Sequence, residues 1–562
     1  MESSLDDRAG SRRTARIAAL VALAIFVYAS FLTTRSTLFD RDEPRFAQAS
    51  VEMVQTGNYL YPTFDGELRP DKPILIYWLA STVVHLFGVS EWAVRFWAPV
   101  SLALSALITF FVGRRLFGAR TGWLAMGLLA IAPLSLMEGT IATTDALLLL
   151  CITAAFASFA FAVLDGVKLW HTLALSAALA AALLTKGPVG LAVPVLSAIV
   201  ALWMLRGRSI VDARHVWMLV IASVVASALF VAWGWPANEA TNGEFYRRGI
   251  GHHVVERVST PLEGHGGNFF LALPYYVPVV LLLSLPATLY LPAALSALFG
   301  GRLGDARTKG LLVAWILPCF VLMSVVSTKL VHYVFPIWPG IALVCAAVID
   351  ASERDALSER DRRWLARGVW FAGVPVALLC AGLLAAPSLI HLPALLVPAI
   401  VMAIALGTSA WFGMRLHRRG LVRSGAHVLI GGFAVAWLVG IALAMPVIER
   451  TKVAPAIAAA IRARTSSEVE VARFKFTEPS LDFYVDRPPI TDLGDEAALA
   501  QWMQGVTPAV LVIPRERIDA LRATLDFTRF EEVATAQGFN ISKGQPLELV
   551  ALCRNLPARS TR

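Results

Sequence analysis

Charged residues are scarce in this chain, and their scarcity excludes an ordinary water-soluble enzyme. Only 16% of the 562 residues are Asp, Glu, Lys or Arg, whereas 57% are hydrophobic, and the mean hydropathy is +0.65. Soluble domains have about 25% charged residues. Apolar runs of about 16 to 25 residues recur, and such runs are long enough to cross a bilayer core as helices. The chain is therefore predicted to be a polytopic membrane protein.

Cysteine is also scarce, and the sequence lacks the common nucleotide-binding motifs. Four of the five cysteines lie inside apolar runs, and Cys553 stands alone near the C-terminus. This spacing predicts neither a disulfide framework nor a cysteine metal site. No Walker motif and no glycine-rich βαβ fingerprint is present, so a cytosolic nucleotide fold is not expected. The net charge of +9 is explained by membrane topology and anionic lipid headgroups, and no nucleic acid partner is expected.

About thirteen apolar segments are predicted to span the membrane. They are residues 16–34, 93–112, 121–136, 145–164, 169–184, 189–205, 216–233, 271–298, 311–326, 333–349, 369–386, 392–414 and 428–447. Arginines gather at the N-terminal end and in five of the alternate connections, which marks that set of connections as cytoplasmic. The short connections between them hold almost no basic residue except Lys186 and Lys329. This alternation predicts an N-terminus inside and a C-terminus outside.

The predicted fold class is an all-α polytopic membrane protein with a small C-terminal α/β domain. Residues 1–448 are expected to form the transmembrane domain, with large outer loops at 35–92 and 236–268, and residues 449–562 are expected to form a soluble domain on the outer side. Apolar residues at helical spacing in the first loop are typical of amphipathic helices at a membrane interface. Large outer loops on a helical bundle are where functional sites tend to lie.

Three acidic residues are candidates for catalysis. Asp42 and Glu43 stand in a dense cluster, Asp-Arg-Asp-Glu-Pro-Arg, directly after the first span, and Asp145 opens the fourth span. A carboxylate at the membrane boundary can stabilise positive charge in a transition state or take a proton from an acceptor. The alternative is helix capping, because Asp followed by Glu-Pro is a good N-terminal signal. Capping explains one carboxylate but not the cluster.

Four basic residues and one tyrosine on the same predicted side are candidates for binding a phosphate. They are Lys72 between two prolines, Arg257, Lys329, Tyr333 and Arg45. Their alternatives are a solvated lysine for Lys72 and an interfacial anchor for the basic and aromatic cluster at 327–333.

Metal binding has weaker support. His252, His253 and Asp71 are weak candidates, because two histidines without a third ligand make a poor site. All the candidates fall on one side of the membrane by a topology derived without them. Acids together with phosphate-binding cations at the outer interface indicate chemistry on a lipid-linked phosphate.

Four motifs carry a resemblance to a known family. In chain order they are Asp42-Glu43-x-Arg45, Gly66 to Lys72-Pro73, Thr144-Asp145, and Lys329-Leu330-x-x-Tyr333-x-x-Pro336. They resemble the GT-C glycosyltransferases related to protein O-mannosyltransferases, and more closely the 4-amino-4-deoxy-L-arabinose transferases (ArnT, glycosyltransferase family 83). Family members often have Glu-Lys-Pro where this chain has Asp71-Lys72-Pro73, which puts a role for Asp71 in doubt.

The resemblance implies inverting transfer of aminoarabinose from undecaprenyl phosphate to lipid A phosphates. The reaction would take place at the periplasmic face of a Gram-negative inner membrane and would confer resistance to polymyxin and other cationic antimicrobial peptides. By the same resemblance Asp42 is the leading catalytic carboxylate, Asp145 is a second acid, and Lys72, Arg257 and Tyr333 hold the carrier phosphate. No cofactor is obligatory, with a divalent metal as an option.

Two other functions compete with this one. Another polyprenyl-phosphate-dependent GT-C enzyme, such as a protein O-mannosyltransferase, would share the motifs but use a different acceptor. A transporter of lipid-linked sugars would show inverted repeats and charges near the bilayer midplane, and the sequence shows neither clearly.

Overall fold

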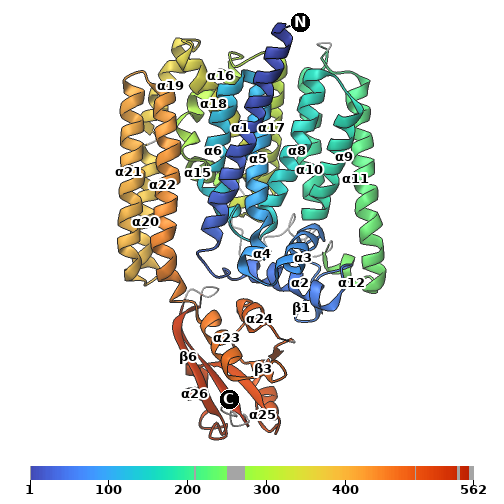
Figure 1. Ribbon diagram of the computed structural model, residues 1–562, viewed down its shortest axis with the longest axis vertical. Coiled ribbons are helices and arrows are strands. Elements are labelled where there is room, and N and C mark those ends of the chain that lie inside the picture. Colours follow the sequence, from blue (N-terminus) through green and yellow to red (C-terminus); the bar gives the residue numbers. More distant parts are fainter. Residues whose placement is uncertain are drawn as a thin grey trace.

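Long helices packed side by side form the body of the protein, and a small domain projects from one end (Figure 1). The computed structural model describes residues 2–207, 210–249, 272–371, 373–487, 489–540 and 545–555. Within these residues eleven helices are long and apolar enough to cross a membrane. The predicted all-α membrane fold with a small C-terminal α/β domain is confirmed. We refer to the end that carries this domain as the C-domain end.

The chain runs back and forth between the two ends of the bundle (Figure 1). The long helices are α1 (Glu2–Thr33), α5 (Trp97–Phe117), α8 (Thr144–Asp165), α9 (Leu169–Lys186), α10 (Pro188–Leu205), α11 (Ala213–Ala240), α17 (Ala306–Val325), α18 (Trp338–Glu353), α20 (Gly373–Leu389), α21 (Leu396–Arg418) and α22 (Val422–Glu449). Four of them are extended by shorter helices, namely α5 by α4 (Glu91–Arg95), α18 by the 3-10 helix η4 (Val331–Ile337), α20 by α19 (Glu359–Phe371) and α21 by the 3-10 helix η5 (Pro393–Leu395).

Two of the thirteen predicted spans are broken, which accounts for the smaller number of long helices. Residues 121–136 divide into α6 (Ala119–Ala130) and α7 (Pro133–Glu138), and residues 271–298 divide into short pieces. The pieces are η2 (Leu273–Tyr275), α15 (Tyr276–Leu283), η3 (Ala287–Leu289) and α16 (Leu291–Phe299). A proline lies at or beside each break, because it lacks the backbone N–H that would continue the helix.

The first outer loop is a folded layer between the bundle and the C-terminal domain. It contains α2 (Asp42–Thr56), the hairpin β1 (Thr63–Phe64) and β2 (Glu67–Leu68), and α3 (Leu75–Phe87). One face of α2 joins the core of the bundle through Phe46 and Met53. Another face joins the core of the C-terminal domain through Ala47 and Val51. The amphipathic helix predicted for a membrane surface is therefore buried between two parts of the protein.

The C-terminal domain is a five-stranded mixed sheet with helices packed against it. The strand order is β4-β3-β5-β7-β6, with β3 parallel to β4 and β5, and β7 antiparallel to β5 and β6. The strands are β3 (Glu470–Arg473), β4 (Thr491–Asp492), β5 (Ala509–Pro514), β6 (Glu531–Asn540) and β7 (Gln545–Arg554), and the helices are α23 (Val453–Arg464), α24 (Ser480–Val485), α25 (Glu496–Met503) and α26 (Arg515–Leu521).

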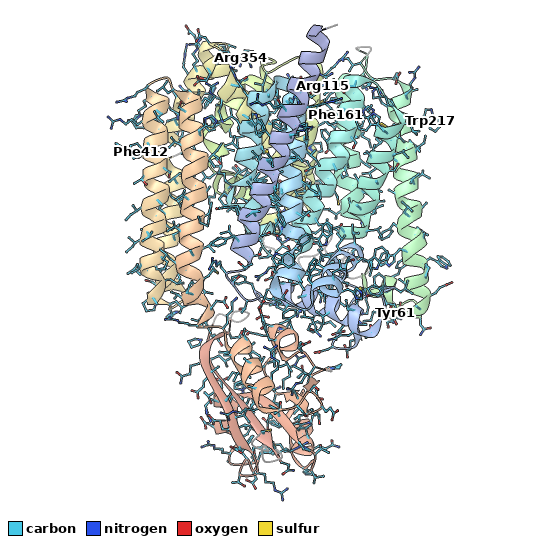
Figure 2. The ribbon with its side chains drawn as sticks, in the orientation of Figure 1. Tyr61, Arg115, Phe161, Trp217, Arg354 and Phe412 are labelled. Carbon is cyan, nitrogen blue, oxygen red and sulfur yellow. The ribbon has the colours of Figure 1, made fainter. Side chains whose placement is uncertain are left out.

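The arginine-rich segments lie at the other end of the molecule. Arg115 and Arg354, from two of these segments, are at the end farthest from the C-terminal domain, whereas Tyr61 of the first outer loop lies near the C-domain end (Figure 2). The alternation of basic connections thus corresponds to the two ends of the bundle. Which membrane face each end meets stays a prediction.

Candidate functional site

A cavity of about 340 Å³ opens at the C-domain end, where several helices terminate. Its polar wall contains Lys72, Lys186, His332 and Tyr333. The rest of its lining is mainly apolar and comes from α8, α10, α11 and α17. A pocket with apolar walls and a few convergent polar groups is suited to an amphiphile with a charged headgroup.

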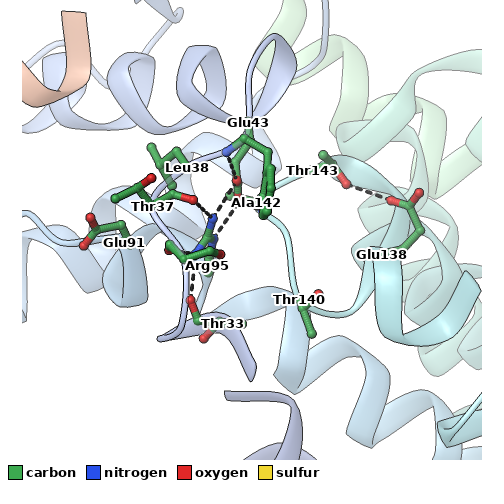
Figure 3. Close-up of polar contacts among 12 residues, drawn as sticks. Thr33, Thr37, Leu38, Glu43, Glu91, Arg95, Glu138, Thr140, Ala142 and Thr143 are labelled. Carbon is green, nitrogen blue, oxygen red and sulfur yellow. Dashed lines mark hydrogen bonds and ion pairs between the residues drawn. The ribbon is translucent and has the colours of Figure 1, made fainter. Parts of the chain in front are cut away.

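Four ionisable side chains meet at one side of this cavity. Lys186 Nζ lies 2.5 Å from Asp145 Oδ1. The imidazole of His332 lies between two carboxylates, with Nε2 3.8 Å from Asp145 Oδ2 and Nδ1 3.7 Å from Glu138 Oε1. Thr143 Oγ1 donates to Glu138 Oε2 at 3.0 Å (Figure 3). Both acids are buried, so the cation and the hydroxyl satisfy charges that would otherwise be costly.

Local sequence explains how these groups meet. Lys186 is the last residue of α9 and Asp145 lies in the first turn of α8, so each charge sits at the helix end whose dipole favours it. Gly187 follows at φ 64°, a left-handed conformation that glycine adopts readily, and Pro188 begins α10. Lys186 Nζ also lies 5.2 Å from the centre of the Tyr333 ring, within cation–π range.

Lys72 is held beside the cavity by a rigid segment. Asp71 pairs with Arg69 at 3.0 Å, and Arg69 Nε donates to the hydroxyl of Tyr77 at 3.2 Å. Burial raises the pKa of Tyr77 to about 12, so this phenol stays neutral at physiological pH. Lys72 lies near enough to act electrostatically on Asp145 and His332. Through its ion pair with Arg69, Asp71 thus helps to hold the backbone segment that carries Lys72.

Asp42 is the exposed carboxylate of the acidic cluster. It is the first residue of α2, its side chain is 74% exposed, and its Oδ1 lies 3.9 Å from Arg45 Nη1. Its charge contributes to the electrostatic field at His332. Asp42 is therefore accessible to a ligand and close enough to His332 to act on it electrostatically.

Glu43 has a different place from the one predicted. Its side chain is 2% exposed and accepts two bonds from Arg95, at 2.6 and 2.8 Å. The backbone N–H groups of Phe39 and Ala142 also donate to it, each at 2.7 Å (Figure 3). A carboxylate surrounded by four donors has no free position for a substrate. We therefore reassign Glu43 from catalysis to holding the loop that carries Asp42.

Lys329 also differs from its predicted role. Its Nζ donates to three backbone carbonyls at the end of α17, those of Met323, Ser324 and Val326. All three hydrogens of an ammonium group are thereby used. Lys329 caps a helix end and is not available to a phosphate.

Of the remaining candidates, some lie within the described residues and others do not. Tyr333 lines the cavity, and Arg45 lies one turn after Asp42. Arg257, His252 and His253 lie outside the described residues. Within the described ranges no group of three His, Cys, Asp or Glu side chains is arranged to hold a metal.

Three site residues were missed from the sequence, namely Lys186, Glu138 and His332. Lys186 did carry a signal, because it is one of only two basic residues in the short connections on its side. His332 lies beside Tyr333, within the motif that begins at Lys329 and ends at Pro336. Glu138 carries no such signal, because its partners Thr143 and His332 become neighbours only in the folded protein.

Comparison with known proteins shows similarity in sequence and in fold. A family model described as dolichyl-phosphate-mannose-protein mannosyltransferase matches residues 71–235, a range that contains Lys72, Asp145 and Lys186. Undecaprenyl phosphate-alpha-4-amino-4-deoxy-L-arabinose arabinosyl transferases from Aeromonas salmonicida and Aeromonas hydrophila are 30% and 29% identical to the chain over 352 and 372 residues. These matches span 62% and 65% of both this chain and the relatives.

The structural likeness covers nearly the whole chain. The crystal structure of ArnT from Cupriavidus metallidurans bound to undecaprenyl phosphate superposes with a TM-score of 0.76, at 22% identity, over 95% of this chain and 97% of that one. The chain resembles the ArnT-like glycosyltransferases in sequence and has their fold. The ArnT-like fold includes the C-terminal domain, since so little of either chain is left out.

Proposed function

We propose that the protein is a glycosyltransferase that moves 4-amino-4-deoxy-L-arabinose from undecaprenyl phosphate to a phosphate group of lipid A. The observation that carries the proposal is a cavity with apolar walls in which Lys72 and Lys186 face the same space. An apolar wall fits a prenyl chain, and two ammonium groups fit the phosphate at its head. The names of the similar enzymes supply the sugar and the carrier.

The proposed reaction exchanges one bond to the sugar for another. The anomeric carbon loses its bond to the carrier phosphate oxygen and gains one to an acceptor phosphate oxygen, with inversion. The acceptor is already anionic near neutral pH, so it does not depend on a general base. Asp42 instead holds the amino group and stabilises positive charge on the sugar ring. Lys72 and Lys186, with Tyr333 and Arg257, meet the charge on the leaving phosphate.

A metal ion is not required by this scheme, because side-chain cations already provide positive charge at the leaving group. Asp145 orients Lys186 through their 2.5 Å contact. We further propose that the C-domain end faces the periplasm, where lipid A and the lipid-linked donor would both be accessible from the bilayer.

Reconstitution tests the proposal directly. Purified protein in liposomes is supplied with undecaprenyl-phosphate-aminoarabinose and lipid A, and mass spectrometry should detect lipid A heavier by one aminoarabinose. Asp42→Asn should abolish transfer. A matched control is Asp355→Asn, because Asp355 is 83% exposed in an arginine-rich connection far from the cavity, and it should retain full activity.

Two results would overturn the proposal. One is unchanged lipid A with wild-type protein, and the other is normal transfer by Asp42→Asn. Mannosylation of a peptide from a polyprenyl-phosphate-mannose donor would instead support the function named by the matching family model.

A further inference from the structure

The C-terminal domain is hydrogen-bonded to the segment that carries Asp42. Ser480, the first residue of α24, donates twice to the carboxylate of Asp40, from its backbone N at 3.0 Å and from Oγ at 2.6 Å. Asp40 is partly buried at this contact and lies two residues before Asp42. Bonds to a charged acceptor are among the stronger hydrogen bonds in proteins. The position of the Asp42 segment therefore depends on a residue 440 positions later in the chain.

A second contact joins the domain to the hairpin that precedes Lys72. Arg473 of β3 donates to Asp65 Oδ2 at 3.1 Å, while its other nitrogens contact Asp482 at 2.8 Å and Asp492 at 3.3 Å. Asp65 forms the turn between β1 and β2. Its backbone N donates to Glu52 of α2 at 2.8 Å. Arg473 thus fixes the hairpin that leads into the Arg69–Lys72 segment.

Other contacts attach the domain independently of these two. Lys452 Nζ donates to the carbonyl of Thr37 at 2.8 Å, and the hydroxyl of Tyr484 accepts from Leu38 N at 2.7 Å. A shared apolar core that includes Ala47, Val51 and residues of α23 lies beside them. Loss of a single polar contact should therefore leave the domain attached, so the two contacts can be tested one at a time.

We propose that the C-terminal domain positions the active site through two contacts. One contact positions the carboxylate that acts on the sugar, and the other positions the lysine that binds the carrier phosphate. Ser480 sets the position of Asp42 through Asp40, and Arg473 sets the position of Lys72 through Asp65 and the hairpin. This inference rests on the proposed roles of Asp42 and Lys72.

The two contacts predict different kinetic defects. Ser480→Ala removes one hydrogen bond to a charged group, so kcat should fall about tenfold while the KM for the donor changes by less than about twofold. Asp65→Gly removes the acid that Arg473 holds, and glycine suits the backbone there, where φ is 55°. Here the KM for the donor should rise about tenfold, with a smaller fall in kcat because Lys72 also meets the charge on the leaving phosphate.

Conservative and matched variants separate positioning from folding. Ser480→Thr and Asp65→Asn keep a hydrogen-bonding group and should restore most of the activity. Thr528→Ala is the matched control, because it removes a 2.6 Å hydroxyl-to-carboxylate bond inside the same domain, to Asp526, and it should match the wild type. The proposal would be overturned if Ser480→Ala and Asp65→Gly changed kcat and the donor KM in the same way. It would also be overturned if Thr528→Ala lost as much activity as these two variants.

Hydrogen exchange supplies a test that does not need activity. Amides of residues 39–46 should exchange faster in Ser480→Ala, and those of residues 63–72 faster in Asp65→Gly, in the full-length protein in detergent. Unchanged exchange in both segments would refute the positioning role. If wild-type protein transfers no aminoarabinose, the proposed function fails, whereas the exchange result still decides whether the domain holds these segments.

Discussion

Lys186 and Lys329 both lie at the C-domain end, and their surroundings give them opposite roles. Lys186 lines the cavity and pairs with Asp145, whereas Lys329 is bound to three carbonyls. Replacing Lys186 with Met removes a preorganised cation from the leaving group, so kcat/KM for the donor should fall about 100-fold. Transfer assays on folded, reconstituted protein measure this. Lys186→Arg keeps the charge and should retain much more activity, and equal losses in the two variants would contradict an electrostatic role.

The corresponding change at Lys329 should affect stability and leave chemistry intact. Lys329→Met leaves three helix-end carbonyls without their donor, which lowers the free energy of unfolding by about 2 kcal/mol. Activity per folded molecule should stay near the wild-type value. Thermal denaturation in detergent together with the transfer assay separates the two effects. A specific loss of donor affinity in this variant would restore the phosphate-binding role predicted from the sequence.

The Glu43–Arg95 pair joins several elements near the site. Arg95 of α4 binds the carbonyls of Thr33 and Ser36 after α1, while Glu43 binds the backbone N–H of Ala142 before α8 (Figure 3). Glu43→Ala leaves a buried guanidinium unpaired and should destabilise the protein by about 3–5 kcal/mol. Thermal denaturation should show a much smaller shift for the exposed neighbour Asp42→Ala. Similar shifts for both would show that the buried pair does not hold these elements together.

Elements with a strong local pattern could be predicted, and those set by distant partners could not. Long apolar runs predicted the spanning helices, and the small C-terminal α/β domain was also predicted. The burial of α2 could not be predicted, because its second apolar face meets the C-terminal domain. The burial of Glu43 could not be predicted for the same reason, since its partner Arg95 lies 52 residues away in the sequence.

At the scale of the whole molecule, charge is sorted between the two ends of the bundle. Basic connections gather at one end, and the cavity with its paired acids and lysines lies at the other. This sorting was predictable because it repeats in most of the alternate connections along the chain. The contact between Arg473 and Asp65 was not predictable, because 408 residues separate them in the sequence. The sequence therefore identifies the end where the site lies, and the fold decides which side chains form it.

The same sorting predicts the orientation of the protein, and single cysteines can test it. The native cysteines give little background, because four are buried and Cys380 lies in a spanning helix. Val506 of the C-terminal domain is 81% exposed, and Asp355, at the opposite end, is 83% exposed. A membrane-impermeant maleimide added to intact spheroplasts should label Val506→Cys and leave Asp355→Cys unlabelled until the membrane is permeabilised. The reverse pattern would place the cavity on the cytoplasmic side, where a periplasmic transfer to lipid A could not occur.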